Sequence, residues 1–111
     1  MKVLVIGKDG QLGSELVKLI HDSRGTSRKG NSGIFLDLKN SSAVEDLIMK
    51  EMPDVVINAA AQTDVDGCEN NRDYAYAINA KAVRNIARAC SITGSYLIHR
   101  MTAHMLPLWL C

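Results

Sequence analysis

Short apolar runs alternate along the chain with longer amphipathic stretches. Two of these runs, Lys2–Ile6 and Asp54–Asn58, are typical of strands covered on both faces of a parallel sheet. Four segments in all are predicted to be strands. They are Lys2–Ile6, Ile34–Leu36, Asp54–Asn58 and Ser95–His99.

The stretches between the runs carry apolar residues at helical spacing. Gln11–His21 has one such stripe, and Asn71–Ser91 has a longer one that is rich in alanine. The longer stripe consists of Ala75, Ile78, Ala82, Ile86 and Ala89. Small side chains along it predict that this second helix packs closely on the sheet.

A third helix is predicted between the second and third apolar runs. Asn40–Ser42 offers residues that cap helix starts, and Glu45 lies three residues after Ser42, as in a capping box. The helix is expected to run to about Glu51, since Pro53 follows.

One segment breaks the alternation. Asp22–Gly33 is polar and rich in Ser, Gly, Arg and Lys, so it is predicted to be a loop, with at most a degraded strand around Gly25–Arg28. Elsewhere strands alternate with helices, which predicts right-handed βαβ units. We therefore expect an α/β fold: a partial doubly wound parallel sheet of four to five strands, with helices on both faces.

Composition restricts the classes of function. The 111 residues carry a net charge of +1, with 47% hydrophobic and 23% charged residues, as in one globular domain. This balance predicts no binding of nucleic acid or of an anionic membrane. No apolar run approaches the ~18 residues of a membrane span, and the N-terminus resembles a strand rather than a signal peptide, so a cytoplasmic protein is expected.

The three cysteines are predicted to be reduced thiols. Cys68, Cys90 and Cys111 are odd in number, far apart and without Cys-x-x-Cys spacing. That pattern disfavours a disulfide framework and a metal site.

Three glycines at a spacing of three residues join the first predicted strand to the first helix. Gly7 permits the sharp exit from the strand, Gly10 lets a ligand approach the backbone, and Gly13 lets the helix pack against the strand. Unpaired N–H groups at the helix start then face a dinucleotide's pyrophosphate. The alternative is a glycine-rich turn without a ligand. The turn residues expected to bind the cofactor are Gly7, Asp9, Gly10, Gln11, Leu12 and Gly13.

The expected nicotinamide cofactor is NADP(H), with NAD(H) as the alternative. An acidic residue about 20 residues beyond the motif usually holds the ribose hydroxyls of NAD. Counted from Gly7, that place is taken by Ser27 and Arg28, followed by Lys29. A hydroxyl and two cations suit a 2′-phosphate. A solvated basic loop is the other interpretation of these residues.

Four stretches together carry a resemblance to a known family. They are Gly7–Gly13, Leu36–Leu38, Pro53–Glu69, and Ala77–Ala80 with the helix after it. Residues 1–99 closely resemble the dTDP-4-dehydrorhamnose reductases, which belong to the extended short-chain dehydrogenase/reductases with a Rossmann-type NAD(P)-binding domain. The resemblance implies NADPH-dependent reduction of a dTDP-4-keto sugar in dTDP-L-rhamnose biosynthesis, with a nucleotide-sugar substrate in the full-length relatives.

The resemblance also implies roles for single residues. It places the Gly10–Leu12 backbone at the pyrophosphate and Asp37 and Leu38 beside the adenine. It implies that Asn79 braces the active site, although Asn79 is equally suited to satisfying backbone groups across the sheet. Beyond the strand that ends at Asn58, it implies a cofactor surface that consists of Ala59, Ala60, Ala61, Gln62 and Thr63.

Two of these assignments have alternatives. The three alanines are also compatible with plain core packing, although open α/β sheets bind ligands beyond the carboxyl ends of their strands. Family members often have an aromatic residue or His where this chain has Gln62, so stacking is expected to be lost there.

No metal site is predicted. Asp64, Asp66 and Glu69 fall in a strand-to-helix loop, where they are expected to cap and solvate the turn. His99 and His104 lack a matching Cys or carboxylate spacing and are taken as incidental.

The family's catalytic pair is missing. The resemblance implies a Tyr-x-x-x-Lys pair in which the Tyr donates a proton to the ketone and the Lys lowers its pKa. Tyr74, Tyr76 and Tyr96 each lack a Lys four positions on, and the sugar-binding part is absent too. No catalytic residue is therefore assigned, and little or no reductase activity is expected from this chain alone.

Residues 100–111 differ from the rest. They are mostly apolar, contain the only Trp, and match no family pattern. Either they are out of frame in a truncated reductase gene, or they form a genuine tail that covers the sheet edge. In the second case the chain would be a non-catalytic NADP-binding or regulatory interaction module. Missing helices would leave a sheet or helix surface bare, which predicts self-association.

Overall fold

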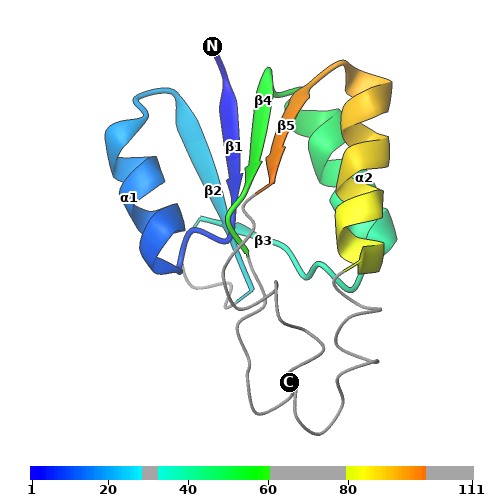
Figure 1. Ribbon diagram of the computed structural model, residues 1–111, viewed down its shortest axis with the longest axis horizontal. Coiled ribbons are helices and arrows are strands. Elements are labelled where there is room, and N and C mark those ends of the chain that lie inside the picture. The colour runs from blue at the N-terminus through cyan, green and yellow to red at the C-terminus, as the bar shows by residue number, and fades with distance from the viewer. Residues whose placement is uncertain (29–32, 61–79, 100–111) are drawn as a thin grey trace, which may run out of the picture.

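The computed structural model describes residues 1–28, 33–60 and 80–99. Within these residues five parallel strands form one sheet, in the order β3-β2-β1-β4-β5. The strands are β1 (Val3–Ile6), β2 (Ser23–Ser27), β3 (Ile34–Phe35), β4 (Val55–Asn58) and β5 (Tyr96–His99). Figure 1 shows β1 at the centre of this sheet. The predicted α/β fold with a doubly wound parallel sheet is confirmed.

The central strand β1 is apolar along its whole length because it is buried there. It pairs with β2 on one side and β4 on the other, so that Val3 lies opposite Ser23 and Val55. All four of its residues are 5% exposed or less. With both faces covered there is no solvent side to favour alternate polar residues.

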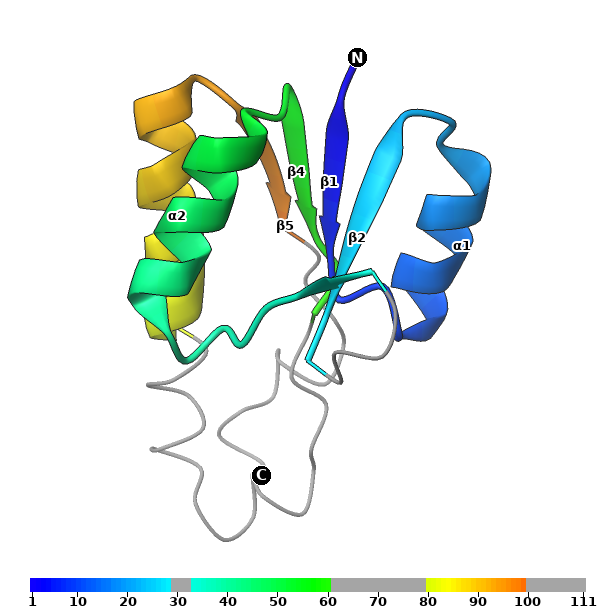
Figure 2. The ribbon, with the colours of Figure 1, turned by 180° about the vertical axis from the view of Figure 1, so that it is seen from behind.

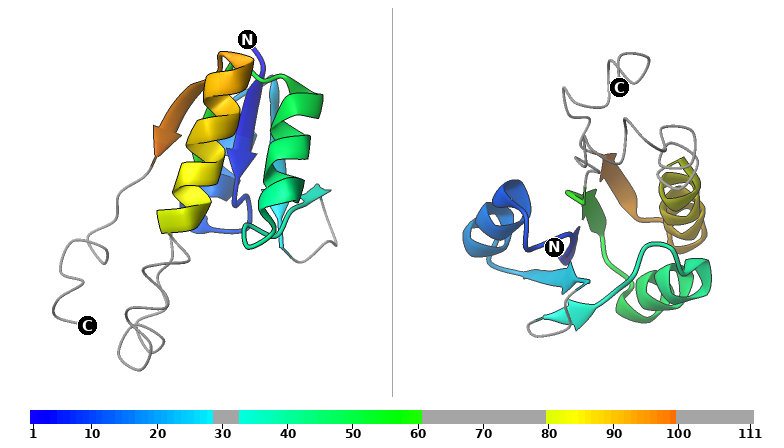
Figure 3. Two further views of the ribbon diagram at one scale, coloured as in Figure 1. Left: turned by 90° about the vertical axis from the view of Figure 1, so that its right-hand side faces the viewer. Right: turned by 90° about the horizontal axis from the view of Figure 1, so that it is seen from below.

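Helices cover both faces of the sheet. α1 (Gln11–Leu19) lies on one face, and α2 (Ser41–Glu51) lies on the other with the helix over residues 80–93, as Figures 1 and 2 show. The end-on view in Figure 3 places the sheet between these two layers. Ala82, Ile86 and Ala89 are buried as predicted, whereas the Ala75 and Ile78 part of that stripe lies outside the described residues.

Each face of the sheet has its own hydrophobic cluster. Beneath α1, Val3, Val5 and Ala59 are buried and receive Leu12 and Leu16. The opposite cluster is the larger. It comprises Leu4, Ile6, Leu36, Val44, Ile48, Val56, Ile86, Ala89 and Cys90. Alternate residues of β1 thus contribute to the two cores, because successive side chains of a strand point to opposite faces of the sheet.

The loop prediction for residues 22–33 is wrong in its first half, where the degraded strand expected around Gly25–Arg28 is a regular strand that begins two residues earlier. Ser23–Ser27 is a strand of five residues, β2, paired with both β1 and β3. Gly25, Thr26 and Ser27 are buried in it despite their small or polar side chains. Gly25 is needed there because a Cβ would come within 2.6 Å of the Lys8 Cβ. Strand pairing and this close approach override the low strand propensity of the sequence.

The predicted capping box does not start α2. The N-cap is Asn40, whose Oδ1 accepts from the Ala43 backbone N–H at 3.1 Å. Glu45 therefore lies beyond the third helical position, where a capping box needs it. The predicted end near Glu51 is correct, and Met52 follows in the left-handed region with φ 47°. The other predicted bounds agree with the observed ones to within two residues, except that the predicted start of the helix over Asn71–Ser91 lies outside the described residues.

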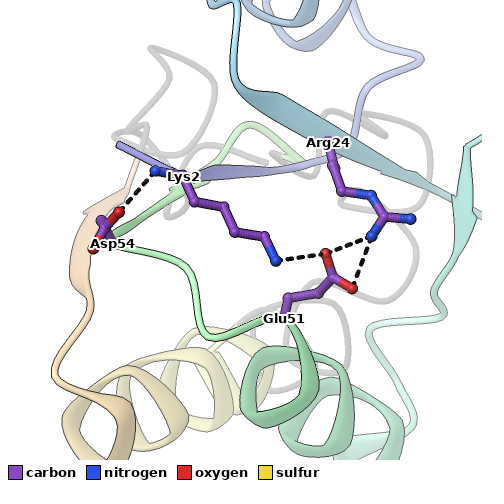
Figure 4. Close-up of polar contacts among 4 residues, drawn as sticks. All are labelled: Lys2, Arg24, Glu51 and Asp54. Carbon is purple, nitrogen blue, oxygen red and sulfur yellow. Dashed lines mark hydrogen bonds and ion pairs between the residues drawn. The ribbon is translucent and has the colours of Figure 1, made fainter.

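Charged side chains tie α2 to the amino-terminal edge of the sheet (Figure 4). Glu51 is buried, and Arg24 Nη1 donates to its two carboxylate oxygens at 2.9 and 3.0 Å. Lys2 Nζ lies 3.5 Å from Glu51 Oε1, and the Lys2 backbone N–H donates to Asp54 Oδ2 at 2.7 Å. A buried carboxylate needs such partners. The cluster therefore joins α2 to the amino-terminal ends of the strands, at the end of the sheet opposite the glycines.

Within the described ranges, no helix is long and apolar enough to span a membrane.

Candidate functional site

The candidate site lies where the strand order reverses, beyond the carboxyl ends of β1 and β4. This is the point at which open α/β sheets bind ligands. We call residues 7–13, between β1 and α1, the glycine turn. Its three glycines have different surroundings. These surroundings show which glycines the fold itself requires and which one leaves room for a ligand.

Gly7 and Gly13 are required by the packing of the chain itself. Gly7 has φ +87°, and a Cβ there would come within 2.7 Å of the Ala60 Cα. A Cβ on Gly13 would collide with the carbonyl oxygen of Gly7. Neither position tolerates a side chain without a backbone shift, so both glycines hold α1, β1 and the end of β4 together.

Gly10 is different. Its φ of −74° suits any residue, and the nearest described atom to a Cβ there is the Gly7 carbonyl oxygen, at 3.8 Å. The fold therefore does not demand glycine at this position. Space beside the backbone is what a bound pyrophosphate needs, so these surroundings fit a dinucleotide.

The start of α1 is also suited to an anion. Gly10 is the N-cap residue, and no side chain caps the helix or places an acidic group in its first turn. Gln11 is exposed and Leu12 half-buried. The backbone N–H groups of a first helical turn carry the positive end of the helix dipole, which favours a phosphate.

On the β2 side, Ser27 is engaged within the protein. Its hydroxyl is buried and donates to the Asp9 carboxylate, and Asp9 is also paired with Lys8 Nζ at 3.4 Å. Arg28 follows β2 and is exposed. The two residues expected to bind a 2′-phosphate therefore differ. Ser27 is buried with a carboxylate as its partner, and Arg28 is an exposed cation.

The residues predicted near the adenine follow β3. Asp37 Oδ1 accepts from the Lys39 backbone N–H at 3.0 Å, and the Asp37 carbonyl oxygen accepts from the Asn40 backbone N–H at 3.0 Å. Leu38 packs against the larger core cluster. Asp37 therefore shapes the turn into α2, with its second carboxylate oxygen available to form a further hydrogen bond.

The end of β4 forms the other side of the site. Ala59 is buried, and its backbone N–H donates to the Ile6 carbonyl oxygen at 2.9 Å. Ala60 is half-buried against Gly7. Both therefore join β4 to the glycine turn, as core packing and cofactor binding each require. The remaining candidates, Ala61, Gln62, Thr63 and Asn79, lie outside the described residues.

Two residues at this end of the sheet were not predicted to belong to the site: Asn58 was missed, and His99 was interpreted as incidental. Asn58 ends β4 with an exposed fraction of 3%, and its Nδ2 lies 3.1 Å from Nδ1 of His99, which ends β5. Asn58 Oδ1 accepts from the Ala60 backbone N–H at 3.2 Å. The signal that could have identified them is one polar residue at the end of each of two apolar strands.

The cysteine and the possible metal ligands considered in the sequence do not add to this site. Cys90 is a free thiol in the larger core cluster, and burial raises its pKa. The described residues contain no group of three or more His, Cys, Asp or Glu able to hold a metal ion. Asp64, Asp66, Glu69 and His104 are not among the described residues.

Comparisons with known proteins agree on one family. The family model "RmlD substrate binding domain" matches residues 1–106. The dTDP-4-dehydrorhamnose reductase of Escherichia coli is 35% identical over 115 residues, which cover 96% of this chain and 36% of that protein. The chain thus spans about a third of the length of the curated relatives it matches.

Solved structures give the same result. A hypothetical dTDP-4-dehydrorhamnose reductase from Sulfolobus tokodaii superposes with a TM-score of 0.76 at 45% identity, covering 89% of this chain and 38% of that one. The enzyme from Bacillus anthracis, in complex with NADP, gives a TM-score of 0.75 at 36% identity, covering 87% and 35% respectively.

Proposed function

Because the chain belongs to the dTDP-4-dehydrorhamnose reductase family, we propose that it binds NADP(H) at the glycine turn, with NAD(H) as the weaker alternative. The observation that carries this proposal is the contrast between the glycines. Gly7 and Gly13 are fixed by packing, whereas no described atom comes closer than 3.8 Å to a Cβ placed on Gly10, at the uncapped start of α1. The Bacillus anthracis relative is in complex with NADP, which supports the choice of cofactor.

The proposed contacts follow from the placement of the residues. The Gly10–Leu12 backbone would hold the pyrophosphate, Asp37 and Leu38 the adenine, and Ala59 and Ala60 the surface beyond β4. Ala61, Gln62, Thr63 and Asn79 complete the proposed set. The Ser27 hydroxyl donates to Asp9. Arg28, the exposed cation next to it, would supply the positive charge that attracts a 2′-phosphate.

The family's reaction is the reduction of a dTDP-4-keto sugar, for which the bound cofactor supplies hydride. The 111 residues contain no Tyr-x-x-x-Lys pair to supply the proton. We propose that this chain provides the cofactor half and has little or no reductase activity alone. The nucleotide sugar would be bound by the part of the relatives that the match does not cover.

The second candidate function is a non-catalytic NADP-binding or regulatory module. It is favoured by a glycine turn that suits a dinucleotide in a 111-residue sequence without a Tyr-x-x-x-Lys pair. Self-association is part of this proposal. Tyr96 and Ile98 of β5, at one edge of the described sheet, are 79% and 54% exposed, so a second copy could cover them. Residues 100–111 remain proposed as a tail distinct from the domain.

Two assays on the 111-residue chain test these proposals. NADPH and NADH are titrated by cofactor fluorescence, and NADPH oxidation is followed with the dTDP-4-keto sugar. We expect NADPH binding without turnover. Absence of NADPH binding would refute cofactor binding, and turnover close to that of a full-length relative would refute inactivity. Sedimentation of the same sample measures self-association, and a strictly monomeric species would contradict it.

A further inference from the structure

The carboxyl ends of β4 and β5 are joined by a pair of side chains. Asn58 and His99 are the last residues of these strands and lie opposite each other in the strand register. Asn58 Nδ2 is 3.1 Å from His99 Nδ1, with Asn58 buried and His99 half-buried. The pair lies at the same edge as the glycine turn, yet neither residue belongs to it.

A backbone group fixes the orientation of the asparagine amide. The Ala60 N–H donates to Asn58 Oδ1, so the amide nitrogen must face His99. The amide nitrogen is a donor only, and therefore His99 Nδ1 must accept, which places the imidazole proton on Nε2. An imidazole with a proton on Nδ1 would bring two hydrogens together and lose the bond.

Ala60 connects this pair to the glycine turn. Its backbone is packed against Gly7 so tightly that a Cβ on Gly7 would lie 2.7 Å from the Ala60 Cα. Gly7 is held from its other side, because its N–H donates to Thr26 Oγ1 at 3.2 Å. Side chains of β2, β4 and β5 thus fix the backbone on both sides of the turn that follows β1.

We propose that His99 is a positioning residue for the dinucleotide. By accepting from Asn58 it holds the asparagine amide, which in turn holds Ala60 against Gly7. The spacing between the glycine turn and the end of β4 is set in this way, without contact between His99 and the cofactor. This inference rests on the proposed NADP(H) binding. It adds His99 as a residue that influences the affinity for NADP(H).

Substitutions of His99 test the role in binding. His99→Leu removes the acceptor at similar volume, and we expect NADPH to bind about tenfold more weakly. His99→Asn can present its Oδ1 at the place of Nδ1, and should bind NADPH within about twofold of the unaltered chain. Ile98→Val, next to it on β5, is the control and should leave the affinity unchanged. Equal binding by His99→Leu and the unaltered chain, or equal weakness of His99→Asn and His99→Leu, would overturn the proposal.

A second experiment needs no cofactor and no loss of the imidazole. Long-range proton–nitrogen NMR correlation reports which ring nitrogen of His99 carries the proton, and we expect Nε2 in the unaltered chain. In Asn58→Asp the group facing His99 becomes an acceptor, so Nδ1 should become protonated while Ala60 keeps its bond. An Nδ1–H tautomer in the unaltered chain would overturn the inference.

The two experiments separate this inference from the proposed function. If the unaltered chain fails to bind NADPH, the proposed function fails and the cofactor role of His99 fails with it. The tautomer of His99 would still decide whether the pair fixes the end of β4. If NADPH binds and the tautomer is Nδ1–H, only the role of His99 is refuted.

Discussion

Arg24 on β2 donates from Nη1 to both carboxylate oxygens of Glu51, the last residue of α2, at 2.9 and 3.0 Å. This pair lies at the edge of the sheet opposite the glycine turn. Its loss should therefore weaken the fold without touching the candidate site.

Replacing Arg24 by Met tests that separation. Glu51 is 6% exposed, and among the described residues it would keep one charged partner, Lys2, at 3.5 Å. Because the Arg24 side chain is itself 56% exposed, we expect the free energy of unfolding to fall by only about 1 to 2 kcal/mol. Urea denaturation measures this loss. A parallel NADPH titration should give the affinity of the unaltered chain, and a weakened affinity would contradict the separation of the two edges.

The glycine turn allows a matched pair of alanine substitutions. Gly10→Ala should fold with nearly unchanged stability, because its φ is −74° and the closest described atom to the new Cβ is 3.8 Å away. Gly13→Ala should lose about 2 kcal/mol or more, since the Cβ collides with the Gly7 carbonyl oxygen. Thermal unfolding compares the two.

The same pair tests the ligand. Gly10→Ala, although folded, should bind NADPH about tenfold more weakly, because its methyl group occupies the space proposed for the pyrophosphate. Undiminished binding by a folded Gly10→Ala would argue against a ligand at this turn.

Cofactor preference depends on the two residues at the end of β2. Arg28→Ala should reduce NADPH affinity by about tenfold and leave NADH affinity nearly unchanged, since only NADPH carries the 2′-phosphate. Titrating both cofactors gives the ratio. Ser27→Ala is the comparison: its hydroxyl already donates to Asp9, so its loss should not lower the affinity for NADPH more than Arg28→Ala does.

Helix capping provides a test of local structure alone. Asn40→Ala removes the acceptor of the Ala43 N–H and should lower the free energy of unfolding by about 1 kcal/mol. Ser42→Ala is the control, because Ser42 lies inside α2 and an interior alanine favours a helix. If Ser42→Ala proved the more damaging of the two, the observed N-cap would be wrong.

Burial explains why the sequence predicts two of the strands, whereas β3 and β5 were predicted from apolar and aromatic residues although none of their residues is buried. Val3–Ile6 and Val55–Asn58 are apolar because both faces of the sheet are covered, and no other element of this length fits such runs. β2 could not be found this way, since Ser23–Ser27 has small and polar residues whose burial depends on β1, β3 and Lys8.

The candidate site, like the sheet, was predictable only in part. The spacing of Gly7, Gly10 and Gly13 identifies the turn, but not which of them the fold itself requires. Asn58 and His99 are 41 residues apart, and only the parallel register of β4 and β5 makes them neighbours. A register across strands is a property of the sheet, and nothing in either segment encodes it.

The position of β1 has a consequence for synthesis. Val3–Ile6 is synthesised before Val55–Asn58, the strand that pairs with it in the sheet but follows it in the sequence. Until β4 is made, the four residues of β1, which are 5% exposed or less in the folded chain, have at most one neighbouring strand. The central strand of the sheet is thus the one whose apolar residues stay partly uncovered until β4 has been made, and exposed apolar surface and unpaired strands favour aggregation during that interval.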